Sequence, residues 1–304
     1  MDMVQFTFPL TEEQKKAKEA KVKLLLKNPM IQKWKQTYQV DDAFIAAHSG
    51  RFQDYCDTLE KCKQCQGLDF CRQADQGNRL ELVLDGMLQT IVVPCRYQQQ
   101  KNKQFAHARK YKQIDMPQDY LCVDISTLNM EQESNDYKMV VMQVMQLLMN
   151  ENANKGFYLW GKPGAGKSYL AAGICNYYAK ANHHVSFVNV PKLISDLKMM
   201  FHDSLAMEEK INSICNVEIL VLDDIGGESV TAWSRDDILL PILDRRMEKK
   251  KLTFFTSNYR MKELKEKLAL ANGKQVEPMA AERILERIST LSCEIFIKGN
   301  SRRK

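Results

Sequence analysis

The feature that most constrains the fold of this 304-residue chain is a glycine-rich octapeptide near its middle. Its residues are Gly161, Lys162, Pro163, Gly164, Ala165, Gly166, Lys167 and Ser168. They match the G-x-x-x-x-G-K-S pattern of a phosphate-binding loop and lie between an apolar run and a helix-forming stretch. The glycines let backbone N–H groups surround a phosphate, and the start of the helix presents more of them. The octapeptide predicts a site for ATP and Mg²⁺, with Lys167 on the β- and γ-phosphates and Ser168 as a magnesium ligand.

The sequence around this loop alternates between strand and helix patterns. The predicted strands cover 157–160, 185–190, 217–222, 252–256 and 294–298, and the predicted helices cover 139–148, 167–181, 191–201, 235–249 and 280–289. Such alternation is typical of a parallel sheet covered by helices on both faces. We therefore expect an α/β fold from Tyr137 onward.

Two acids and an amide follow neighbouring strands of this predicted sheet. The apolar run from Ile219 to Leu222 ends in Asp223 and Asp224, and the next strand is followed by Asn258. We expect Asp223 to hold Mg²⁺ through water and Asp224 to polarise the attacking water. Asn258 is a candidate for holding that water beside the γ-phosphate, and the alternative is a simple turn residue.

The last predicted helix carries two arginines on one face. Arg283 and Arg287 are four residues apart, so both can point in the same direction. One of them could reach the ATP of a neighbouring subunit and stabilise charge in the transition state. The alternative is a pair of surface arginines matched by Glu282 and Glu286.

The first hundred residues have a different pattern. Short helical segments are followed by two apolar runs, 80–84 and 87–93, joined at Asp85-Gly86 as in a tight β-hairpin. The stretch from Arg96 to Lys112 has several basic residues and no acid, which is typical of a solvated linker and compatible with DNA binding. We predict an N-terminal domain over 1–98, a basic linker over 99–136 and an ATPase domain over 137–304.

Cysteines cluster in the N-terminal part. The chain has nine, an odd number, and we see no export signal, so metal ligation is favoured over a disulfide framework. Cys62, Cys65 and Cys71 have a spacing suited to a structural tetrahedral zinc. A redox role for Cys62-x-x-Cys65 would need a βαβ context. The fourth zinc ligand is left open among Cys95, Cys56 and His107.

Composition limits the partners only loosely. The net charge of +6 is compatible with nucleic acid but does not require it. We find no run of about 20 apolar residues that could span a membrane. We also find no secretory signal at the N-terminus, so we expect a cytoplasmic protein with no membrane partner.

The order of these motifs resembles that of AAA+ ATPases. More narrowly, residues 222–226, 256–258 and 286–288, with Trp233 and Arg235-Asp236, resemble the DnaC-type replicative helicase loaders. The resemblance covers nearly the whole chain and is looser over the first hundred residues. It implies that Arg287 is the arginine finger and that the N-terminal domain binds zinc and a hexameric replicative helicase. It also implies self-association through the ATPase domain, which binds single-stranded DNA.

The sequence ends at Lys304, shortly after the last predicted strand, so we expect an AAA+ core with no C-terminal helical lid. The loader family shares this shortening, which implies weak hydrolysis in isolation. The expected function is ATP-dependent loading of the helicase onto single-stranded DNA during primosome assembly, in replication initiation or restart. The alternative is a transposition helper or initiator-like ATPase that assembles on duplex DNA. Candidate DNA contacts are Lys192, Lys198 and Phe201.

Overall fold

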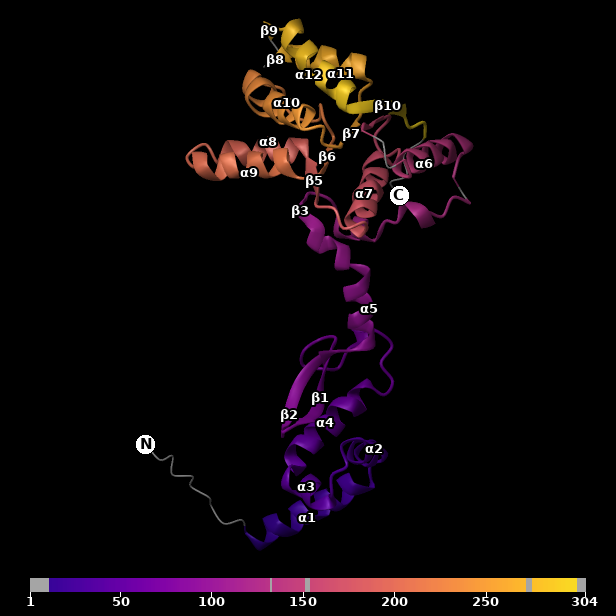
Figure 1. Ribbon diagram of the computed structural model, residues 1–304, viewed down its shortest axis with the longest axis vertical. Helices are drawn as coiled ribbons and strands as arrows, with labels where there is room; N and C mark the ends of the chain where they lie inside the picture. Colours follow the sequence, from indigo (N-terminus) through magenta and orange to yellow (C-terminus); the bar gives the residue numbers. More distant parts are fainter. Residues whose placement is uncertain (1–10, 132, 151–153, 272–274, 300–304) are drawn as a thin grey trace. The chain divides into compact units, whose positions relative to one another are not determined.

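The computed structural model describes residues 11–131, 133–150, 154–271 and 275–299 (Figure 1). The chain divides after Lys103 into two compact units, each with its own core. Among the described residues, no helix is both long and apolar enough to cross a membrane.

The N-terminal unit, residues 1–103, packs short helices against a hairpin. Its elements are α1 (Glu12–Lys27), α2 (Pro29–Tyr38), α3 (Asp42–Ala47), α4 (Ser49–Cys62), η1 (Leu68–Phe70), β1 (Asn78–Asp85) and β2 (Met87–Pro94), followed by α5 (Arg96–Gln104). Asn28 ends α1 and caps α2, where Pro29 takes the first helical position. The indole Nε1 of Trp34 donates to the carbonyl of Leu82 at 2.8 Å, which joins helices and hairpin in one core. The predicted Asp85-Gly86 hairpin is confirmed.

The second unit is built on a six-stranded sheet in which all strands are parallel, in the order β10-β4-β7-β6-β5-β3. The strands are β3 (Tyr111–Ile114), β4 (Gly156–Trp160), β5 (Val185–Asn189), β6 (Ile219–Asp223), β7 (Thr253–Ser257) and β10 (Ser292–Phe296). Every residue of β6 and β7 is buried, as in a sheet covered on both faces. The predicted α/β fold with a parallel sheet is confirmed. The sequence pattern indicated every strand of this sheet except β3.

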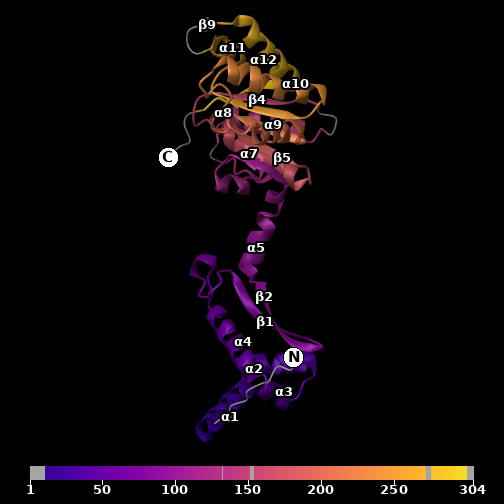
Figure 2. The ribbon, with the colours of Figure 1, turned by 90° about the vertical axis from the view of Figure 1, so that its left-hand side faces the viewer.

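Helices cover the two faces of this sheet. They are α6 (Asn135–Leu148), α7 (Lys167–Lys180), α8 (Val190–Met199), α9 (Ser204–Asn216), the π-helix η5 (Trp233–Leu239), α10 (Leu240–Glu248), α11 (Met261–Ala269) and α12 (Pro278–Leu291), with β8 (Leu270–Ala271) and β9 (Gln275–Val276) as a small ribbon. Figure 2 shows α7 on one side of β4 and α10, α11 and α12 on the other. Alternate residues follow this division, because Phe157 and Leu159 belong to one core cluster and Tyr158 to the other.

The segment predicted as a linker belongs largely to the second unit, which corrects the boundary given above. Residues 104–131 form η2 (Ala106–Lys110), β3, η3 (Gln118–Cys122) and η4 (Ile125–Thr127). The amide of Asn176 on α7 donates to the carbonyls of Tyr120 and Val123 at 2.8 Å and accepts from the hydroxyl of Tyr111 at 2.6 Å. Isolated buried residues, such as Tyr111 and Ile125, anchor this segment in the core of the second unit. Their irregular spacing gave no periodic pattern in the sequence.

Candidate nucleotide-binding site

The phosphate-binding loop joins β4 to α7, as the motif predicts. Gly161, Gly164 and Gly166 have φ of 156°, 81° and 96°, a region that favours glycine. A Cβ at Gly161 would lie 2.3 Å from the carbonyl oxygen of Ile297 on the chain after β10. Backbone conformation and close packing therefore both require glycine in this loop.

Lys167 lies at the centre of the loop and is only 7% exposed. Its Nζ donates to the carbonyls of Gly161 at 2.8 Å and Lys162 at 2.9 Å, and to Oδ1 of Asn258 at 2.8 Å. An ammonium that donates to carbonyl and amide oxygens can form stronger hydrogen bonds with phosphate oxygens, because those bonds are charge-assisted at both ends. This arrangement fits the predicted role of Lys167.

Asp223, the last residue of β6, and Asp224, which follows it, are both held by Thr256 on the neighbouring strand β7. The Thr256 hydroxyl donates to Oδ1 of Asp223 at 2.7 Å and accepts from the backbone N–H of Asp224 at 2.9 Å. Asp223 also accepts a bond from Nδ2 of Asn189, at the end of β5, at 3.3 Å. Asp224 has a left-handed backbone with φ of 57°, which turns its side chain out of the strand direction.

Asn258 connects the two motifs. Its Oδ1 accepts from Lys167, and its Nδ2 donates to Oδ1 of Asp224 at 2.9 Å. The structure thus brings together Lys167, Asp224 and Asn258, which the sequence motifs assign to one nucleotide site. The catalytic roles of Asp224 and Asn258 stay predictions.

A buried glutamate lies just behind this site. Glu228 is 5% exposed, and its Oε2 accepts from the backbone N–H of Gly226 at 2.9 Å. Burial raises the pKa of its carboxyl group above the usual range. The turn between Asp224 and Glu228 is tight, because a Cβ at Gly227 would lie 2.3 Å from Oδ2 of Asp224.

A pocket of about 720 Å³ opens between these motifs and the segment that precedes α6. This volume suits a nucleotide-sized ligand. One wall consists of the phosphate-binding loop, Asp223, Asp224 and Asn258. The other wall includes Tyr120, Leu128, Asn129, Met130 and Tyr137, a mixture of apolar and hydrogen-bonding groups that suits a nucleoside. Sequence reasoning missed this wall because it treated residues 99–136 as a linker, although Tyr120, Leu128 and Met130 were visible there as apolar residues.

Arg287 lies on α12, and the described residues that line the pocket include no arginine. Its Nε donates to Oδ1 of Asp244 on α10 at 2.7 Å, and its Nη1 donates to Glu286 at 2.7 Å. Arg283 is exposed on the same helix. Of the pairs in the alternative interpretation, that of Arg287 with Glu286 is present, whereas Glu282 pairs with Lys265. Asp244 is a partner of Arg287 that the sequence did not indicate.

Hydrogen bonds bring Cys62 close to Cys65, and Cys71 close to Cys95, in the N-terminal unit. The N–H of Cys65 donates to the carbonyl of Cys62 at 3.2 Å, and the N–H of Gly77 donates to Sγ of Cys71 at 3.4 Å. The N–H of Cys95 donates to the carbonyl of the same Gly77 at 2.7 Å. Within the described ranges, however, no three His, Cys, Asp or Glu side chains are close enough to hold a metal ion. Zinc ligation by Cys62, Cys65, Cys71 and Cys95 stays a prediction.

The two other candidates for the fourth zinc ligand have structural roles. Cys56 is buried in the helical core, where the amide of Asn28 donates to its Sγ at 3.4 Å. His107 is buried in the second unit, and its Nε2 lies 3.3 Å from Oδ1 of Asn176. Because Cys56 is buried in the helical core and His107 belongs to the second unit, Cys95 remains the preferred candidate.

Comparison with known proteins identifies relatives over most of the chain. The family of IstB-like ATP binding proteins matches residues 87–304. The replicative helicase loader DnaI of Bacillus subtilis (strain 168) is 31% identical over 273 residues, which cover 87% of this chain and 85% of that protein. The replicative helicase loader DnaC of Escherichia coli (strain K12) is 36% identical over 109 residues, which cover 36% of this chain and 44% of that protein.

Solved structures agree with these relatives. A crystal structure of DnaI matches with a TM-score of 0.55 and 34% identity, covering 65% of this chain and 99% of that one. A crystal structure of the DnaC helicase loader has a TM-score of 0.50 at 22% identity, covers 60% of this chain and 100% of that one, and supports the fold alone. The resemblance inferred from the motifs is thereby confirmed. The chain belongs to the family of IstB-like ATP-binding proteins and is also a relative of the replicative helicase loader DnaI.

Proposed function

We propose that this protein uses ATP to load a hexameric replicative DNA helicase onto single-stranded DNA during primosome assembly, in replication initiation or restart. The observation that carries the proposal is the similarity to DnaI, which spans 87% of the chain and so extends over both units. A nucleotide pocket built from Lys167, Asp223, Asp224 and Asn258 supplies the ATP dependence.

Hydrolysis in this pocket would act as a release switch rather than as a metabolic reaction. Lys167 would bind the β- and γ-phosphates, and Ser168 and Asp223 would hold Mg²⁺, which neutralises phosphate charge. Asp224, with Asn258 bonded to its carboxylate, would orient and polarise the attacking water.

A neighbouring protomer would complete this site through Arg287. The described lining of the pocket includes Lys167 but no arginine, and Arg287 lies on α12, which does not line the pocket. A guanidinium supplied in trans links hydrolysis to self-association, because turnover then requires a correctly placed second protomer.

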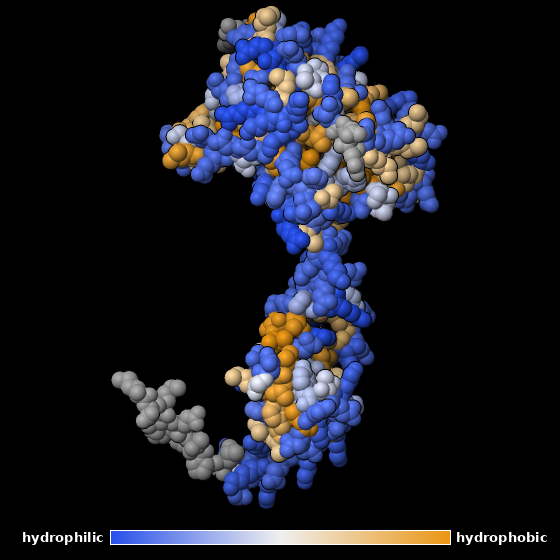
Figure 3. Space-filling model, viewed as in Figure 1, coloured by the Kyte–Doolittle hydropathy of each residue, from blue (hydrophilic) through white to orange (hydrophobic). Residues whose placement is uncertain are grey.

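The N-terminal unit would bind the helicase. Figure 3 shows apolar side chains gathered over the hairpin of this unit, where Met87, Ile91 and Val92 of β2 are exposed. Exposed apolar side chains grouped in this way are typical of protein-binding surfaces.

We also propose that the N-terminal unit binds a structural zinc ion through Cys62, Cys65, Cys71 and Cys95. Backbone and amide N–H groups already donate to the sulfur atoms of Cys62 and Cys71, which would favour thiolates there. Metal analysis of the purified protein should find about one zinc ion per chain. A folded N-terminal unit that contains no metal would contradict this prediction.

Single-stranded DNA would be contacted by the second unit. Lys198 lies in the last turn of α8, and Phe201 follows two residues after the end of that helix. Phe201 is 55% exposed and packs edge-on against Trp233, with 4.9 Å between the ring centroids. Such a pairing of a basic and an aromatic side chain suits a flexible single strand. Lys192 is a weaker candidate, because its Nζ is already paired with Asp115.

The second candidate function is that of a transposition helper or initiator-like ATPase on duplex DNA. The match of residues 87–304 to the IstB-like family favours it. That match leaves most of the N-terminal unit unexplained, whereas the similarity to DnaI extends over it.

A loading assay tests the proposal. The full chain is mixed with the replicative helicase, circular single-stranded DNA and ATP, and the helicase retained on DNA is measured. Wild-type protein should increase retention, and Lys167→Ala should abolish both the increase and ATP turnover. Arg287→Ala should lower turnover severely, whereas Arg283→Ala on the same helix serves as the matched control. Binding to duplex DNA with no effect on the helicase would favour the alternative function.

A further inference from the structure

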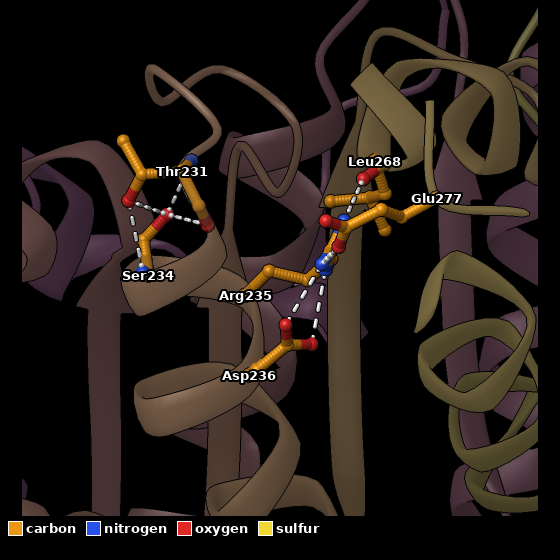
Figure 4. Close-up of polar contacts among 6 residues, drawn as sticks. All are labelled: Thr231, Ser234, Arg235, Asp236, Leu268 and Glu277. Atoms are coloured by element: carbon orange, nitrogen blue, oxygen red, sulfur yellow. Dashed lines mark hydrogen bonds and ion pairs between the residues drawn. The ribbon is translucent and has the colours of Figure 1, made fainter. Parts of the chain in front are cut away.

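The helix that carries Arg287, α12, is attached to the segment that follows β6. This segment consists of η5 and α10, which are continuous in the chain. The first attachment lies at the start of α12, where Glu277 forms an ion pair with Arg235 of η5 (Figure 4). Arg235 is completely buried, and it also donates to the carbonyl of Leu268 at 3.0 Å and to Oδ2 of Asp236 at 2.7 Å. The start of α12 is therefore fixed to η5.

The second attachment is made by Arg287 itself. Asp244 of α10 accepts a 2.7 Å bond from its Nε, and the side chain of Arg287 is 22% exposed. Glu286, the other partner of Arg287, is 69% exposed and binds Nη1. The two carboxylates thus hold different nitrogens of one guanidinium and differ in their access to water.

This division matters because the terminal nitrogens of a guanidinium can bind phosphate oxygens while Nε is held by another group. Asp244 accepts the hydrogen bond from Nε, which fixes the direction of the Arg287 side chain and does not occupy both terminal nitrogens. Glu286 takes Nη1, but an ion pair between an exposed carboxylate and arginine is weak, so phosphate oxygens can replace it. The long side chain is ordered before it meets a partner, which lowers the entropy cost of a productive encounter.

We infer that Asp244 is a positioning residue for Arg287, holding its guanidinium by Nε so that the terminal nitrogens are directed at the ATP of a neighbouring protomer. The inference rests on the proposed role of Arg287 in trans. Asp244 itself touches neither nucleotide nor water in this mechanism. Its effect on turnover is exerted entirely through Arg287.

The test is a double-mutant cycle in the full chain, with Asp244→Asn, Arg287→Ala and the double variant. ATP turnover is measured at protein concentrations above which specific activity no longer rises. Asp244→Asn should lower kcat about tenfold to a hundredfold, as expected for a misplaced catalytic group, with KM for ATP nearly unchanged. In the Arg287→Ala background the same substitution should have no further effect on kcat. Glu286→Gln is the control, and its kcat should equal or exceed that of the wild type.

The outcomes separate this inference from the proposed function. If Arg287→Ala leaves kcat unchanged, the role of Arg287 in trans is wrong, and the inference falls with it. If Arg287→Ala lowers kcat but Asp244→Asn leaves it unchanged or raises it, only the positioning role is wrong. Thermal unfolding of each variant measures whether the substitution also changes stability. Effects of Asp244→Asn and Arg287→Ala that multiply would show that Asp244 acts on stability or assembly independently, and would also overturn the inference.

Discussion

Glu228 shows how a single buried group near the nucleotide site opposes folding at neutral pH. Burial raises the pKa of its carboxyl group, so its charged form is disfavoured in the folded protein. Between the unfolded and the folded pKa values, the folded state binds more protons than the unfolded state. The contribution of this group to the free energy of unfolding is therefore highest at low pH, where Glu228 is neutral, and it falls as pH rises through the folded pKa of this group.

We predict that Glu228→Gln stabilises the second unit at pH 8 relative to the wild type and makes its stability less dependent on pH above about 4.5. The amide oxygen can still accept the bond from Gly226. Urea unfolding at several pH values checks this, and a loss of stability at pH 8 would contradict it.

Glu218 provides a control of opposite sign. A hydrogen bond from His183 lowers the pKa of its carboxyl group to about 2, so this group contributes stability above its unfolded pKa and loses it as pH falls toward 2. Glu218 is nearly half exposed, so the effect of Glu218→Gln at neutral pH should be a small loss of stability.

The contacts of α10 depend on a second buried arginine. Arg246 is completely buried, and its burial lowers the pKa of its guanidinium to about 10. Its Nη1 donates to the carbonyls of Ile214 at 3.1 Å and Val217 at 2.8 Å, and its Nη2 donates to that of Leu252 at 2.6 Å. One side chain thus links α10 to the end of α9 and to the residue before β7.

We predict that Arg246→Leu destabilises the second unit by about 3–5 kcal/mol, because several buried carbonyls lose their donor at once. Arg245→Ala, at an exposed neighbouring position on the same helix, should cost less than about 0.5 kcal/mol. Thermal or urea unfolding compares the two. Equal effects would show that the carbonyls bound by Arg246 find water instead.

At the scale of elements, the sequence predicted what depended on continuous local patterns. The apolar runs of β4, β6 and β7 and the glycines of the phosphate-binding loop each report a local requirement, and these elements were confirmed. β3 was missed because its place in the sheet depends on pairing with β5, which lies far along the chain. The motifs of the nucleotide site were predictable for the same reason, because each is a short continuous stretch of sequence. The contact of Asp244 with Arg287 was not, because it depends on the packing of α10 against α12.

At the scale of the whole molecule, the division after Lys103 determines which fragments should fold. A fragment over 104–304 keeps β3 and the pocket wall around Tyr120, whereas one over 137–304 loses both. The shorter fragment also leaves the amide of Asn176 without its partners Tyr111, Tyr120 and Val123.

We predict that 104–304 unfolds cooperatively and binds ATP, and that 137–304 is much less stable and binds ATP weakly. Calorimetry and titration with a fluorescent ATP analogue distinguish the two. Equal ATP affinity of both fragments would show that the wall contributed by residues 120–131 does not contact the nucleotide.

The placement of β3 and the pocket wall also limits how this chain can recombine with others. A gene fusion that joined a new N-terminal module at residue 137 would respect the motifs and still break the nucleotide site. A junction close to residue 104 would transfer the working ATPase intact. The exchangeable module is therefore longer than its motifs suggest, and related chains that differ in their N-terminal units should retain a counterpart of residues 104–131.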